Sequence, residues 1–187
     1  MIAPLGIRSA ANRTAVVREL SASLLRASTA REALFFWCEA HGISSGPITV
    51  VRREPKELND PDDDMLEELR PRRDERIAHR SVRLMRGRIL LSEADDWFIP
   101  DRLPTDIGGV LEATNAPFGA AVARLWPSRR TYFVSFAEWM TDDTGNAGRL
   151  ASLSSSMTIL EHKTVVADRN RRPLSVTSER YCLSLME

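Results

Sequence analysis

Apolar and polar residues alternate in the middle of the chain in a way that predicts two antiparallel strands. Val82 and Leu84 occupy every second position, the chain reverses through Arg86-Gly87-Arg88, and the apolar run 89–91 follows. Alternation on both sides of a glycine-containing turn is typical of a β-hairpin. Arg80 is in phase with Val82 and Leu84, so it faces the core if they do. A guanidinium in the core needs an anion beside it, either a protein carboxylate or an anionic ligand.

Similar patterns predict the other elements. A helix begins near Thr14, and a second covers Ala30–Ala40, with Ser28 or Thr29 as its cap and His41-Gly42 as its end. Proline at position 100 ends the strand that follows the hairpin turn. Further helices are expected near 65–69 and over 105–111 and 118–125, further strands over 48–51, 131–136, 157–167 and 174–183, a loose lead-in over 1–12, and a long loop over 141–156.

Helices at the start, followed by strands that are mostly joined by hairpins, predict an α+β fold. We expect one domain over residues 1–187, built on an antiparallel sheet with helices packed on one face. A ligand would then lie between the sheet and the helices, or on the other face of the sheet.

Composition excludes several classes of protein. The 187 residues carry 26 basic and 26 acidic side chains, so we expect no nucleic-acid or membrane partner. The start lacks the apolar region of a signal peptide and no run is long enough to span a membrane, which predicts a cytoplasmic protein. Cys38 and Cys182 lie in apolar surroundings and are expected to be buried free thiols. We expect a monomer or a small homo-oligomer.

The segment 52–76 is highly charged, with an acidic run at 60–64 and a basic cluster at 70–73. We expect a solvated loop with a short helix near 65–69, and an interaction surface or a lid over a site as alternatives.

The usual catalytic signatures are missing from the sequence. Gly108-Gly109 lacks the spacing and the lysine of a phosphate-binding loop, the three histidines form no metal-binding motif, and no serine nucleophile elbow occurs. We therefore expect neither a zinc enzyme, nor an NTPase, nor a serine hydrolase.

The last strand contains an acid whose direction the pattern leaves open. Alternation places Glu179 on one face with Thr177 and Tyr181, and Arg180 on the other face with Val176 and Cys182. The second face is the more apolar, so the pattern alone favours Arg180 inward, and a β-bulge would reverse this assignment.

Several short motifs resemble those of the chorismate pyruvate-lyase family. They are RSVRL from Arg80, WFIP from Trp97, APFG from Ala116, RPLSVTSERY from Arg172, and the helix-to-strand stretch 29–54. The resemblance implies an antiparallel sheet of about six strands with helices on one side and a buried ligand cavity beneath helical flaps. It also implies a lyase that needs no cofactor and releases pyruvate from chorismate, or from a related cyclic carboxylate, to leave a hydroxybenzoate.

The resemblance also implies roles for particular residues. Arg80 would bind the ring carboxylate of the substrate, because its planar fork suits a carboxylate. Glu179 would be the second catalytic residue, near the ring oxygen. Phe118 and Gly119 of the flap turn would contact the substrate. Apart from the resemblance, Trp97 and His162 complete the expected binding set, although a structural role is favoured over a catalytic one for His162.

Two departures from the family keep other functions open. Glu179 lies six residues after Pro173, one more than in a typical lyase, and the region from Arg124 to Ser156 matches no part of the family pattern. The alternatives are a cofactor-free enzyme of specialised metabolism, such as a cyclase, that holds a larger apolar substrate in the same cavity, and a non-catalytic domain that binds a small molecule.

Overall fold

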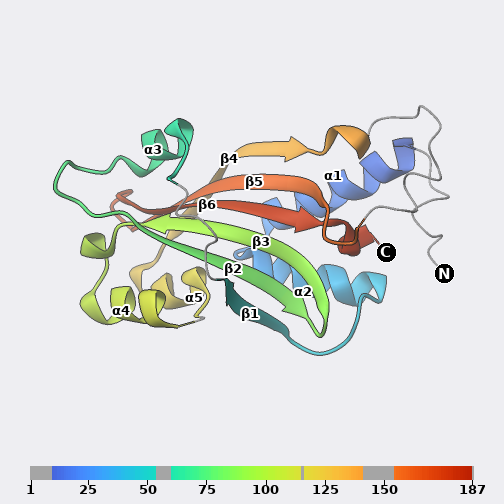
Figure 1. Ribbon diagram of the computed structural model, residues 1–187, viewed down its shortest axis with the longest axis horizontal. Helices are drawn as coiled ribbons and strands as arrows, with labels where there is room; N and C mark the ends of the chain where they lie inside the picture. The colour runs from blue at the N-terminus through green and yellow to red at the C-terminus, as the bar shows by residue number, and fades with distance from the viewer. Residues whose placement is uncertain (1–9, 54–59, 115, 141–153, 187) are drawn as a thin grey trace.

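The computed structural model of the chain describes residues 10–53, 60–114, 116–140 and 154–186 (Figure 1). Its helices are α1 (Ala10–Arg26), α2 (Ala30–His41), α3 (Asp63–Leu69), α4 (Thr105–Ala113) and α5 (Phe118–Val122). Its strands are β1 (Ile48–Arg53), β2 (Ala78–Arg86), β3 (Ile89–Phe98), β4 (Ser128–Phe136), β5 (Thr158–Ala167) and β6 (Pro173–Cys182).

The described strands form one antiparallel sheet in the order β1-β2-β3-β6-β5-β4. The predicted hairpin is confirmed as β2 and β3, which meet at the pair Arg86 and Ile89. Gly87 allows the tight turn because it has a φ of 58°, a left-handed conformation that glycine adopts at little cost. The predicted α+β fold class with its antiparallel sheet is confirmed.

The ends of α2 lie where the sequence placed them. The Thr29 hydroxyl accepts a hydrogen bond from the Glu32 amide at 3.2 Å, and Gly42 closes the helix in a left-handed conformation. At the first helix the prediction was too short: α1 begins at Ala10, so residues 10–12 are not part of a loose lead-in. Alanines at 10 and 11 favour helix strongly, which explains the earlier start. Residues 1–9 of the predicted lead-in, and 141–153 of the predicted loop, lie outside the described residues.

Four of the described helices cover one face of the sheet (Figure 1). At one end, α1 and α2 pack on Leu84, Leu160 and Tyr181. At the other end, α4 and α5 pack on Phe98 and Val166. This face, called the helical face below, therefore holds two separate apolar clusters with polar residues of the sheet between them.

The helix α3 packs on the opposite face, which the sequence reading did not anticipate. Met65 and Leu69 are buried against Trp97 and Val176 there. The lid alternative for residues 60–76 is therefore not supported, because these two apolar side chains hold the segment on the face away from the helical face.

The strand β6 alternates without a register shift against β3. Glu179 pairs with Ala94 and faces the helical face, whereas Arg180 is half-buried on the other face and forms an ion pair with Asp95. The rule that the more apolar face points inward therefore gave the wrong direction for Arg180. It failed because α3 buries the apolar side of β6 as well, so both faces of this strand are covered.

Cys38 and Cys182 are both free and buried, as expected. Among the described residues, no helix is long and apolar enough to cross a membrane.

Candidate functional site

A cavity of about 340 Å³ lies between the helical face and the helices α2 and α5. Its size is at the lower end of the range for small-molecule sites. Most of its surface is apolar, and the apolar side chains on it include Val50, Val82, Leu84, Ala94, Phe118 and Val166. Five charged residues also line it: Arg31, Arg80, Asp96, Arg129 and Glu179. The cavity therefore combines mainly apolar walls with a few charged side chains.

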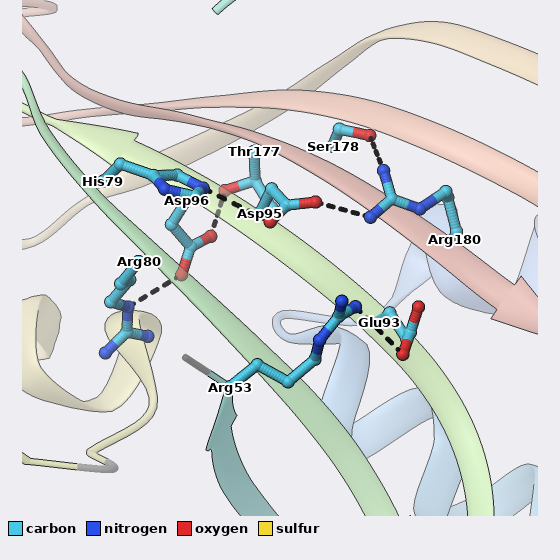
Figure 2. Close-up of polar contacts among 9 residues, drawn as sticks. All are labelled: Arg53, His79, Arg80, Glu93, Asp95, Asp96, Thr177, Ser178 and Arg180. Atoms are coloured by element: carbon cyan, nitrogen blue, oxygen red, sulfur yellow. Dashed lines mark hydrogen bonds and ion pairs between the residues drawn. The ribbon is translucent and has the colours of Figure 1, made fainter. Parts of the chain in front are cut away.

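The inward direction predicted for Arg80 is confirmed, since the residue is 3% exposed and lines the cavity. Its Nε donates to the Asp96 carboxylate at 2.9 Å (Figure 2). Its Nη1 donates to the Ala116 carbonyl at 2.8 Å. Asp96 also accepts from the Thr177 hydroxyl at 2.7 Å. The anion beside the buried guanidinium is thus a protein carboxylate, and the second bond ties β2 to the turn that precedes α5.

Glu179 also lines the cavity, on the side formed by the sheet, and is 7% exposed. Its carboxyl accepts a hydrogen bond from the Ser92 hydroxyl at 2.7 Å. Burial raises the pKa of Glu179, and the hydrogen bond from Ser92 and the charge of Arg129 only partly oppose this shift. The group is therefore an acid that holds its proton at a higher pH than an exposed glutamate does.

Arg129 enters the cavity from β4, and the sequence gave it no role. Its Nη1 donates to the Leu24 carbonyl at 3.3 Å, a long bond to a neutral acceptor. Within the described parts of the chain, no ion pair joins Arg129 to an acid. The charge of Arg129 lowers the pKa of both Glu179 and His162 in part, so the guanidinium lies within electrostatic reach of both.

Phe118 and Gly119, two of the residues expected to contact a substrate, line the cavity. Phe118 is 7% exposed and packs 6.0 Å from the ring of Phe98. At Gly119 a β-carbon would lie 3.5 Å from the Thr29 methyl group. The start of α5 and the start of α2 therefore approach each other closely at the wall.

Trp97 and His162 belong to the expected binding set, but neither lines this cavity. Trp97 lies on the opposite face, in the apolar cluster under α3, and stacks on His79 at 5.0 Å. His162 faces the helices, but the Ser21 hydroxyl of α1 covers it with a hydrogen bond of 3.0 Å to its Nε2. Burial lowers the pKa of His162 to about 4.

Other polar and hollow regions are less suited to hold a small molecule. On the face away from the cavity, Asp95 contacts His79 at 3.2 Å and forms an ion pair with Arg180 (Figure 2). An open groove of about 470 Å³ separates α1 from α2, lined by side chains such as Glu32, Phe36 and Trp37. No group of three or more metal-ligating side chains occurs in the described ranges.

Comparison with solved structures identifies the fold. PhnF from Mycobacterium smegmatis superposes with a TM-score of 0.54 at 12% identity, covering 87% of this chain and 67% of that one. The effector domain of PhnF superposes with a TM-score of 0.50, also at 12% identity, covering 81% and 86% of the two chains. The fold is the chorismate lyase-like fold that these proteins share.

Comparison with curated sequences then gives the family. The uncharacterized protein y4mC of Sinorhizobium fredii (strain NBRC 101917 / NGR234) is 30% identical over 181 residues, which cover 92% of this chain and 76% of that protein. The chain belongs to the same family as y4mC. No protein-family model matches the sequence.

Proposed function

We propose that the protein binds a small organic molecule in the cavity between the helical face and the helices α2 and α5. The observation that carries this proposal is the cavity itself, with its apolar walls and the buried charges of Arg80, Asp96 and Glu179 on one side. Concave, mainly apolar sites with a few fixed polar groups are the usual form of a ligand site. The fold likeness to the effector domain of PhnF is consistent with a binding role.

A lyase that acts on chorismate or a related cyclic carboxylate is the second candidate. It is favoured by Glu179, a buried carboxyl with a raised pKa that could move a proton at a reacting oxygen. Against it stands the geometry of Arg80, whose Nε and Nη1 already donate to Asp96 and Ala116. The same apolar cavity walls could instead contact a larger apolar substrate that needs fewer charged contacts, as in a cyclase.

One set of measurements separates these functions. The protein is titrated calorimetrically with small aromatic and alicyclic acids, 4-hydroxybenzoate among them, and is incubated with chorismate while 4-hydroxybenzoate release is followed. The binding proposal predicts heats of binding without turnover. Sustained release of 4-hydroxybenzoate that is lost in Glu179→Gln would favour the lyase instead.

A cavity-filling variant locates the binding. Ala94 lies between Val82 and Glu179 in the sheet and lines the cavity. The variant Ala94→Trp places an indole in that space and should abolish binding, although overpacking costs about 1–3 kcal/mol of stability. Binding that persists unchanged in a folded Ala94→Trp protein would place the site elsewhere and refute the proposal.

A further inference from the structure

The charged side chains that line the cavity differ in whether an oppositely charged side chain already pairs with them. Arg80 and Asp96 form a pair at 2.9 Å with side chains that are 2% and 6% exposed. Asp96 receives a further hydrogen bond from Thr177. Two opposite charges in direct contact leave little net field for a third group. An anion that enters the cavity therefore gains little from Arg80.

Arg129 differs in its partners. It lines the same cavity and donates to the neutral Leu24 carbonyl at 3.3 Å, and it also interacts with the buried Tyr181 hydroxyl. The neighbouring Arg130, in contrast, points to the other face and pairs with Glu68 of α3. A guanidinium that lines a cavity and forms no ion pair with the described residues can bind a carboxylate of a ligand.

Glu179 lines the same cavity, and burial raises its pKa and so disfavours its charged form. Its carboxyl is buried beside apolar residues and accepts from the Ser92 hydroxyl. A protonated carboxyl keeps one O–H donor for a hydroxyl or carbonyl oxygen of a bound molecule. Arg129 and Glu179 thus offer one guanidinium and one carboxyl contact on the apolar cavity wall.

We propose that the cavity binds an organic monoanion with an apolar body, and that Arg129, rather than Arg80, contacts its charge. This inference rests on the proposed binding function. Arg80 then acts as a positioning residue, because it holds the Ala116 carbonyl at the start of the flap and keeps Asp96 neutralised. Arg31, at the start of α2, is a second cation at the exposed edge of the same cavity.

The test uses two probes of the same shape and different charge, 4-hydroxybenzoate and 4-hydroxybenzamide. The full chain should bind the acid at least about tenfold more tightly than the amide, since a hydrogen bond to a charged group is worth about 1.5–3 kcal/mol. In Arg129→Gln this preference should disappear. In the matched control Arg130→Gln, which removes the same charge from the opposite face, the preference should remain.

The outcomes distinguish the inference from the proposed function. If Arg129→Gln keeps the preference for the acid, or if the unmodified protein binds the amide as tightly as the acid, the anion site at Arg129 is refuted while the binding function stands. If the unmodified protein binds neither probe, both fail. Arg129→Lys keeps the positive charge and should retain most of the preference, which separates loss of charge from a folding defect.

Discussion

The buried imidazole of His162 makes the stability of the protein depend on pH in a defined direction. The side chain is 0% exposed, and burial, assisted by the charge of Arg129, lowers the pKa of His162 from 6.5 in a free side chain to about 4. Among the described residues its Nδ1 meets no hydrogen-bond partner, so a second proton on the ring would be buried without an acceptor there. The folded state therefore holds the neutral ring at a pH where the unfolded chain already binds a proton.

The sign and the size follow from proton linkage. Between pH 6.5 and about 4 the unfolded state binds more protons than the folded state, so the free energy of unfolding falls as the pH falls. At about 1.4 kcal/mol per pKa unit, the shift corresponds to a loss of about 3 kcal/mol across this window. The stabilisation is complete above pH 6.5 and is gone once the pH drops below the folded-state pKa.

Urea unfolding followed by circular dichroism at pH 7 and at pH 4 measures this loss. The variant His162→Gln keeps a polar partner for Ser21 without a titrating ring, so the pH-dependent loss of the unmodified protein should exceed that of the variant by about 3 kcal/mol. Equal losses in the two proteins would show that His162 is not kept neutral by burial, and the reasoning would be wrong.

Two further predictions concern other buried charges. Because burial raises the pKa of Glu179 above 4.5, the folded state binds the extra proton, and the stability contributed by this group should fall as the pH rises from 4.5 through the folded-state pKa. Urea unfolding over a series of pH values should show this fall in the unmodified protein but not in Glu179→Gln. The same pH dependence in both proteins would contradict the raised pKa of Glu179. Arg102 joins Glu75 to the backbone carbonyls of Leu69, Arg70 and Pro173, with side chains that are 3% and 7% exposed. Arg102→Ala should cost about 1–3 kcal/mol of unfolding free energy, because three carbonyls lose their donor while Glu75 keeps only Arg172 and the Arg72 amide as partners, and a loss below about 0.5 kcal/mol would contradict this.

The sequence predicted most of the fold because its signals are local. Thr29 and Gly42 define the ends of α2, Gly87 defines the turn of the hairpin, and the alternation of Val82 and Leu84 defines the face of β2. Each of these signals depends on residues within a few positions of each other and predicts one local structure. The inward direction of Arg80 and its need for an anion followed from the same alternation.

The partner of Arg80 could not be predicted in the same way. Counting outward from the Gly87-Arg88 turn, a regular hairpin pairs Arg80 with Asp95, and both residues would then share a face. The register shift between Leu84 and Met85 moves the pairing by one residue, so that Asp96 lies opposite Arg80. A bulge depends on packing in three dimensions and leaves no clear mark in the sequence.

Arg129 was missed for the same reason. Regular alternation from Phe133, which faces away from the cavity with Lys163, would place Arg129 on that outer face as well. The register shift between Thr131 and Phe133 moves Arg129 to the cavity side, opposite Val166. The direction of Glu179 stayed open in the sequence for a different reason, because the helix α3 covers the other side of β6 and removes the contrast between an inner and an outer face.

A crystal structure of the protein grown with excess 4-hydroxybenzoate tests the central claim most directly. The account predicts density for the ring among Val82, Leu84 and Phe118, with the carboxylate within hydrogen-bonding distance of the Arg129 guanidinium. An empty cavity in such crystals, or density in the groove between α1 and α2 despite calorimetric binding, would contradict it.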